Sequence, residues 1–296
     1  MERAFGRVAV TGAGGLLGYD VSKALLPHAE QVYAWKRADL DVTDLHAVLA
    51  MFRERRPEAV VHAAAYTRID QAESEPDLAF QANAIGARNV ALAAETVGAK
   101  MVYVSTDHVF PGTGDIAWNE YRETQPINVY GSTKRAGEWL AGSLLPRLFI
   151  VRTSRLFGEG GPNFVETMLN MAKRKGPIRV VGDQIGSPTY AADLARAIVR
   201  LLTTEKYGTY HISNSGSCSW YEFAERIFEL AGIDAELAAV TSAEFKRPAA
   251  RPPYSVLDHM ALKANGFPPM RAWEDALREY MGRRRQLAKE PRPFEC

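Results

Sequence analysis

Cysteine is scarce in this chain: only Cys218 and Cys296 occur among its 296 residues, and they lie far apart in the sequence. There is no CxxC motif and no histidine cluster with the spacing of metal ligands. Neither a disulfide scaffold nor a structural zinc site is therefore expected, and we predict no bound metal. Sparse cysteine is typical of a reducing compartment, which favours a cytoplasmic protein.

The chain also lacks an excess of charge of one sign and any long hydrophobic run. Its 36 Lys and Arg balance 35 Asp and Glu to a formal net charge of +1, which gives no reason to expect a nucleic-acid partner. The basic run Arg283-Arg284-Arg285 is typical of a solvated helix end. No stretch reaches the roughly 18 apolar residues of a membrane helix, and residues 1–7 lack the apolar core of a signal peptide, so no membrane association is expected.

The composition is that of an ordinary globular protein, with 47% hydrophobic and 24% charged residues. Short apolar runs alternate with amphipathic stretches of ten or more residues. This alternation predicts α/β architecture, in which right-handed βαβ units build a Rossmann-like doubly wound parallel sheet. We expect strands at 7–11, 31–34, 59–62, 100–105, 148–153 and 208–213, and helices at 16–26, 45–55, 76–97, 128–142, 191–202 and 219–231.

After residue 157, loops rich in Gly and Pro interrupt this rhythm, and an irregular Pro-rich loop is expected at 246–253. A helix and a strand within 191–215 could return to the main sheet. The predicted organisation is an NAD(P)-binding Rossmann domain of residues 1–157 and 191–215, a smaller discontinuous C-terminal substrate lobe of residues 158–190 and 216–285, and a flexible tail of residues 286–296.

Three glycines follow the first predicted strand directly. Gly12, Gly15 and Gly18 have the spacing G-x-x-G-x-x-G, in which the first permits a tight turn, the second lets the backbone approach a pyrophosphate, and the third lets helix pack on strand. The helix that follows offers free N–H groups to an anion. A Gly-rich turn without a ligand could look the same, but this position in a parallel sheet favours a dinucleotide site.

The end of the second predicted strand bears on the choice of dinucleotide. It carries Lys36 and Arg37 where NAD binders usually have an acidic residue, and an Arg there accommodates the extra phosphate of NADP. NADP(H) is therefore favoured, with NAD(H) as the alternative; the two cations could also simply face solvent. Further candidate contacts are Asp41-Val42 at the adenine edge and the small residues Ala63-Ala64-Ala65, although a well-packed strand end would resemble the latter.

A third group of residues carries the chemistry. Ser105, Thr106 and Asp107 end the fourth predicted strand, at the edge of the sheet where ligands bind. Tyr130 and Lys134 are four residues apart, on one face of a predicted helix. An ammonium beside a phenol lowers its pKa from about 10, and Lys134 could also hold the ribose of a nicotinamide cofactor. We expect a carbonyl-reduction site in which the cofactor gives hydride to carbon, Tyr130 gives a proton to oxygen and Thr106 binds that oxygen.

In this order, these residues resemble the extended short-chain dehydrogenase/reductases and, more narrowly, the dTDP-4-dehydrorhamnose reductases. The resemblance extends from about residue 7 to about residue 280. The blocks that carry it are AAAYTRIDQAESEP (63–76), STDHVFPG (105–112), NVYGSTK (128–134), RTSRLFG (152–158), DQIGSPTY (183–190), CSWYEFA (218–224) and ARPPYS (250–255).

The resemblance implies a function and a set of roles. The reaction would be NAD(P)H-dependent reduction of the 4-keto group of a dTDP-4-dehydro-6-deoxyhexose, dTDP-4-dehydro-L-rhamnose being the family's substrate in dTDP-rhamnose biosynthesis. Tyr130, Lys134 and Thr106 would be catalytic, and Asp107 and Arg155 would touch the sugar. The cofactor would be lined by Gly15-Leu16-Leu17, Asp41-Val42, Ala65-Tyr66-Thr67, Asn83 and Ser105, in addition to the glycines and alanines above.

Two positions depart from the family pattern. Residue 155 is commonly Trp in the family and is Arg155 here, which places the identity or orientation of the sugar in question, since Arg could also reach a diphosphate. Some relatives bind magnesium at a dimer contact through an acidic residue, but the matching position here is Ala192, so the metal is not carried over. A homodimer is left open by the sequence.

The C-terminal lobe is expected to grip the nucleotide diphosphate. Arg251 is the candidate for this contact, with a plain surface cation as the alternative reading. Gln184, Pro188 and Thr189 are expected in the crevice wall, whereas Trp220 and Tyr221 are expected to pack in the lobe.

Two other functions are compatible with the same fold. A nucleotide-sugar 4,6-dehydratase or epimerase is one, but dehydratases pair Asp with Glu after the Thr, and here His108 follows Asp107. A non-catalytic NADP-binding regulatory subunit is the other, and the retained Tyr130 and Lys134 argue against it.

Overall fold

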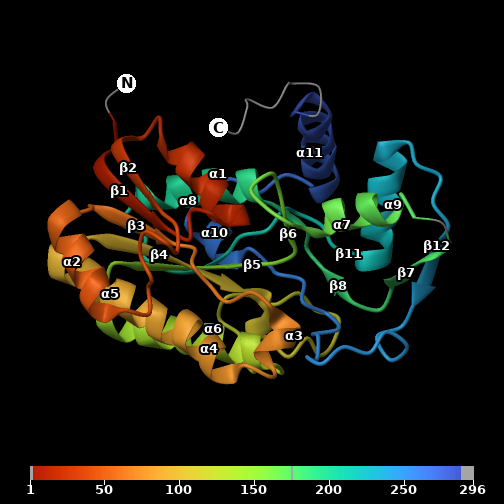
Figure 1. Ribbon diagram of the computed structural model, residues 1–296, viewed down its shortest axis with the longest axis horizontal. Helices are drawn as coiled ribbons and strands as arrows, with labels where there is room; N and C mark the ends of the chain where they lie inside the picture. Colours follow the sequence, from red (N-terminus) through yellow and green to blue (C-terminus); the bar gives the residue numbers. More distant parts are fainter. Residues whose placement is uncertain (1–2, 175, 288–296) are drawn as a thin grey trace.

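The computed structural model describes residues 3–174 and 176–287, and a parallel sheet of six strands forms its centre (Figure 1). The strand order is β10-β5-β4-β3-β1-β2, and each neighbouring pair is parallel. This confirms the predicted doubly wound fold. The strands are β1 (Phe5–Thr11), β2 (Ala29–Trp35), β3 (Ala59–His62), β4 (Lys100–Thr106), β5 (Leu148–Thr153) and β10 (Gly208–His211).

Helices cover both faces of this sheet because its strands are apolar on both sides. Val8 and Val10 pack into one core cluster, and Ala9 between them packs into the other, since successive side chains of a strand point to opposite faces. The first cluster is completed by α1 (Leu16–Leu25), α8 (Ala191–Leu202) and α10 (Met260–Ala264), and the second by α2 (Leu45–Arg55), α5 (Gly86–Val97) and α6 (Val129–Leu144).

A third apolar cluster lies beyond the carboxyl ends of the strands, on the right of Figure 1. Phe157, Tyr190, Phe223 and Tyr280 are its aromatic centre. It belongs to the part of the chain where we predict the substrate lobe; the division into lobes itself stays a prediction. The cluster is built from β6 (Leu156–Phe157), α7 (Phe164–Met171), β7 (Ile178–Val181), β9 (Thr189–Tyr190), β11 (Cys218–Ser219), α9 (Trp220–Ala231), β12 (Leu237–Val240) and α11 (Trp273–Leu287). A further short strand, β8 (Ile185–Gly186), pairs with β11.

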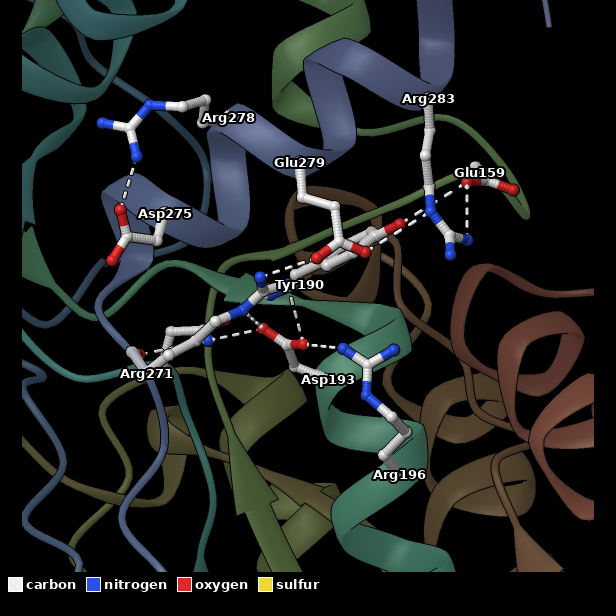
Figure 2. Close-up of polar contacts among 10 residues, drawn as sticks. Glu159, Tyr190, Asp193, Arg196, Arg271, Asp275, Arg278, Glu279 and Arg283 are labelled. Carbon is white, nitrogen blue, oxygen red and sulfur yellow. Dashed lines mark hydrogen bonds and ion pairs between the residues drawn. The ribbon is translucent and has the colours of Figure 1, made fainter. Parts of the chain in front are cut away.

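A polar network joins this cluster to the helices of the sheet (Figure 2). Arg271, just before α11, donates to both carboxylate oxygens of Asp193 on α8, at 2.7 and 2.9 Å, and to Glu279 at 2.6 Å. Asp193 is buried, and a forked pair of this kind fixes orientation as well as distance. The start of α11 is thereby held against α8.

Two expectations from the sequence need correction. The single helix expected at 76–97 is divided into α4 (Pro76–Phe80), a π-helical turn at Gln81–Ile85 and α5. In addition, α11 continues to Leu287, past the predicted start of the tail; the rest of that predicted tail, 288–296, lies outside the described residues. Within the described part of the chain, no helix is long and apolar enough to cross a membrane.

Candidate active site

The glycine turn between β1 and α1 is too tight for side chains. Gly12 has a φ of 70°, and a Cβ there would lie 2.5 Å from the backbone nitrogen of Ala64. A Cβ on Gly18 would lie 2.2 Å from the carbonyl oxygen of Gly12. Gly15 caps α1 without any side-chain hydrogen bond, so the helix N-terminus stays open to an anion.

A cavity of about 1080 Å³ extends from this turn, past the carboxyl ends of the strands, to the loop that contains Arg251. It brings together most of the predicted site residues, which come from segments far apart in the sequence. Those that line it are Gly12, Gly15, Leu16, Leu17, Gly18, Arg37, Asp41, Val42, Ala63, Ala64, Ala65, Tyr66, Thr67, Ser105, Thr106, Asp107, Tyr130, Lys134, Arg155, Gln184 and Arg251.

Four predicted binding residues, Pro188 among them, do not line the cavity, which corrects their placement. The side chain of Lys36 lies next to Gly14, which lines the cavity, but Lys36 itself does not line it. Thr189 is fully buried in β9, which pairs with β6. Asn83 is fully buried on the π-helical turn, where it accepts from the backbone nitrogen of Tyr66 at 2.7 Å and donates to its carbonyl oxygen at 3.1 Å. Asn83 therefore supports the cavity wall indirectly, by holding the backbone of Tyr66 in place.

At the adenosine end, Arg37 is 88% exposed and lies 3.7 Å from the carboxylate of Asp41. Asp41 accepts hydrogen bonds from the backbone nitrogen and the hydroxyl of Thr43, at 2.9 and 2.8 Å. The backbone hydrogen bond is the main reason why the pKa of Asp41 lies below its usual value. Arg37 is thus a cation at the cavity edge with a weak protein partner.

At the other end, Tyr130 and Thr106 meet above the sheet. Burial raises the pKa of Tyr130 to about 12, opposed by a hydrogen bond with Thr106 and reinforced by the charge of Asp107. The expected net lowering of this pKa is wrong, because loss of hydration is the largest contribution and raises it. At neutral pH the phenol is therefore protonated.

The side chain of Lys134 is held in place by residues of β4. Its ammonium donates to the carbonyl oxygen of Val104 at 2.7 Å and lies 4.1 Å from the centre of the Tyr103 ring. Burial lowers the pKa of Lys134 to about 7, opposed by the negative charge of Glu138.

Glu138 is a residue that the sequence analysis missed. It forms a buried ion pair with Arg152 of β5, at 2.7 Å, and accepts from the Ser105 hydroxyl at 2.5 Å. Tyr130, Lys134 and Glu138 follow one another at intervals of four on α6, so an extended motif Y-x-x-x-K-x-x-x-E is the signal that could have identified it.

Arg155 holds two walls of the cavity together. Its guanidinium donates to the carbonyl oxygens of Cys218 and Gln184, at 2.7 and 2.8 Å, and lies 4.2 Å above the ring of Trp220. Burial lowers its pKa to about 10. Trp220, expected only to pack, both packs on Phe164 and lines the cavity.

Arg251 approaches the same cavity from the C-terminal loop. It pairs with Asp70 of α3 (Ile69–Ala72) at 3.0 Å and donates to the carbonyl oxygen of Ala249 at 2.8 Å. His108 and Ser255 also line the cavity. Neither was predicted there, since nothing in the local sequence pattern shows that these loops meet. Among the described residues, no group of three or more His, Cys, Asp or Glu side chains could hold a metal ion.

Residues 6–286 match the family model described as the RmlD substrate binding domain. The chain belongs to this family. It is 44% identical to the spore coat polysaccharide biosynthesis protein SpsK of Bacillus subtilis, over 94% of this chain and 98% of the relative. It is also 44% identical to a dTDP-4-dehydrorhamnose reductase of Streptomyces griseus, over 92% of each chain.

A solved structure supports the same assignment. The dTDP-4-dehydrorhamnose reductase of Bacillus anthracis, crystallised in complex with NADP, is 47% identical and superposes with a TM-score of 0.92, over 94% of this chain and 99% of that one. The predicted resemblance is thereby confirmed.

Proposed function

We propose that this chain reduces the 4-keto group of a dTDP-4-dehydro-6-deoxyhexose with NADPH, and that dTDP-4-dehydro-L-rhamnose is its substrate. The observation that carries the proposal is the cavity shared by the glycine turn and by Tyr130, Thr106 and Lys134. Relatives at 44 to 47% identity with the names of such reductases support it.

The residues present fit a dinucleotide. The turn at Gly12, Gly15 and Gly18 would receive the pyrophosphate against the N-terminus of α1, and Arg37 would face the 2′-phosphate that distinguishes NADP(H) from NAD(H). Lys134 would hold the nicotinamide ribose. When bound, NADPH supplies the hydride for the carbonyl carbon.

The protein's own side chains handle the proton. The Tyr130 hydroxyl, protonated at neutral pH, would give its proton to the carbonyl oxygen as the hydride arrives, and the Thr106 hydroxyl would bind that oxygen. Lys134, one helical turn away on α6, would stabilise the phenolate that remains. Asp107, Gln184 and Arg155 would contact the sugar.

Arg251 would leave its ion pair with Asp70 and contact the diphosphate of the substrate instead. The roles of all these residues are proposals. So are a homodimer and a cytoplasmic location, the latter favoured by the scarcity of cysteine.

Tyr130→Phe tests the proposal most directly. With a dTDP-4-keto-6-deoxysugar as substrate, the variant should lose more than about tenfold in kcat, measured by NADPH absorbance, because only the proton donor is removed. NADPH binding, followed by fluorescence titration, should be unchanged. Turnover close to that of the wild type would contradict the role of Tyr130.

The same assay separates the other candidate functions. Steady consumption of NADPH supports a reductase, product isomers without consumption indicate an epimerase, and cofactor binding alone indicates a regulatory subunit. No specific observation in the described residues favours either alternative.

A further inference from the structure

His108 lies in the substrate half of the cavity but has no role in the mechanism above. It follows Thr106 and Asp107 in a short 3-10 turn at the end of β4, and it lines the cavity. Its ring meets the ring of Tyr130 edge to face, with 5.5 Å between the centroids. The imidazole is therefore adjacent to the proposed proton donor.

Asn128 determines which nitrogen of this ring carries the proton. The Asn128 Oδ1 atom caps α6 by accepting from the backbone nitrogen of Gly131 at 2.7 Å, so Nδ2 must point the other way. There Nδ2 donates to the carbonyl oxygen of Ala250 at 2.8 Å and to Nδ1 of His108 at 3.0 Å. A nitrogen that accepts cannot also carry the proton, so the neutral ring is protonated at Nε2.

Burial, helped by two cations, favours the neutral form of His108. Burial lowers its pKa below the usual value, and the cations Arg251 and Arg155 act in the same direction against the attraction of Asp107. Since Nδ1 is turned to Asn128, the Nε2–H group on the opposite edge of the ring is the donor that His108 can offer to a ligand in the cavity that it lines. None of the described residues accepts a hydrogen bond from Nε2.

We propose that His108 is a substrate-positioning residue, which donates a hydrogen bond from Nε2 to the hydroxyl on C3 of the sugar. This inference rests on the proposed function. In a 4-keto-6-deoxyhexose, C3 carries the hydroxyl next to the reduced carbon, and His108 lies next to the two residues, Thr106 and Tyr130, that face the keto oxygen. A ring with its proton already on Nε2 cannot accept one there, so His108 serves as a donor and does not replace the second carboxylate of a dehydratase.

The test compares two substitutions with two substrates. His108→Phe keeps an aromatic ring but removes the donor, and His108→Gln keeps an N–H donor without the ring. With the natural substrate, His108→Phe should raise KM about two- to tenfold, the size expected for one neutral hydrogen bond, while kcat changes less than about threefold. His108→Gln should recover part of this loss, and NADPH affinity should be the same in all three proteins.

A 3-deoxy analogue of the substrate identifies the oxygen. For the wild type, it should raise KM by the same factor as His108→Phe does, and for His108→Phe it should cause no further loss. Independent, additive losses would overturn the assignment to C3, and an unchanged KM in His108→Phe would overturn the proposal.

Failure of the proposed function would be visible separately, as a wild type that consumes no NADPH. In that case, calorimetric affinities of wild type and His108→Phe for the same dTDP-sugar decide the role of His108. Equal affinities, or no binding to either protein, would overturn it.

Discussion

Neutralising Glu138 should destabilise the protein and also shift its activity profile. Glu138 and Arg152 have side chains only 7% and 8% exposed, and two hydrogen bonds join them, at 2.7 and 2.9 Å. The substitution Glu138→Gln keeps the shape of the side chain but removes its charge. The guanidinium of Arg152 then stays buried without a counter-charge, because the ring of His211 at 3.4 Å is neutral and the ring of Phe110 carries no charge.

The expected loss follows from the cost of an unpaired buried charge, about 3 to 5 kcal/mol when one partner of such a pair is removed. Unfolding entropy of roughly 2.1 cal/mol/K per residue, over 296 residues, converts this loss into a decrease in Tm of about 5 to 8 °C. Replacing both partners by apolar residues, as in Glu138→Leu with Arg152→Met, should cost much less than Glu138→Gln alone.

Differential scanning calorimetry and urea unfolding of the three proteins measure these values. A loss below about 1 kcal/mol in Glu138→Gln would refute the reasoning, since it would mean that water or another group solvates Arg152. Activity provides a second readout. Glu138 opposes the lowered pKa of Lys134, so in the variant Lys134 should lose its proton, and the enzyme its activity, at a lower pH than in the wild type. An unchanged alkaline limb of the pH profile would show that Glu138 does not act on Lys134.

Three further predictions concern other parts of the chain. Arg37→Asp should weaken NADPH more than NADH, measured as the ratio of their dissociation constants, because Arg37 would face the 2′-phosphate; equal losses would show that it does not. Gly137→Ala should lower the free energy of unfolding by about 1 to 3 kcal/mol and also lower kcat. The reason is that a Cβ there would lie 2.3 Å from the Tyr103 hydroxyl and push α6 away from the sheet. Wild-type values of Tm and kcat would contradict this. Stability should also fall as pH decreases below about 6.5, by up to about 1.4 kcal/mol per pH unit for each of the buried His62 and the half-buried His259. Burial lowers their pKa values to about 3 and 4, so the unfolded chain binds protons that the folded one does not; thermal unfolding at pH 7.5 and 5.5 tests this, and a smaller pH dependence is expected for His62→Gln.

The sequence by itself determined the sheet and the site's central residues. The six strands of the central sheet were placed within a few residues because their signals are local: the apolar run at Ala59–His62, for example, is a buried strand. The site residues could be grouped because parallel strands bring their carboxyl ends to one edge. Gly12 and Thr106 could thus be assigned to one cavity without any knowledge of the distance between them.

Only the tertiary structure decided how these residues behave. The pKa of Tyr130 depends on burial by segments distant in the sequence, which is why its predicted direction was wrong. Asn83 was expected on the cavity wall but lies behind it, because a π-helical turn directs its amide to the backbone of Tyr66. Arg155 uses two of its donors on carbonyl groups about 30 and 60 residues away in sequence. The local hydrophobic pattern of the sequence does not predict such contacts, since each forms only once the chain has folded.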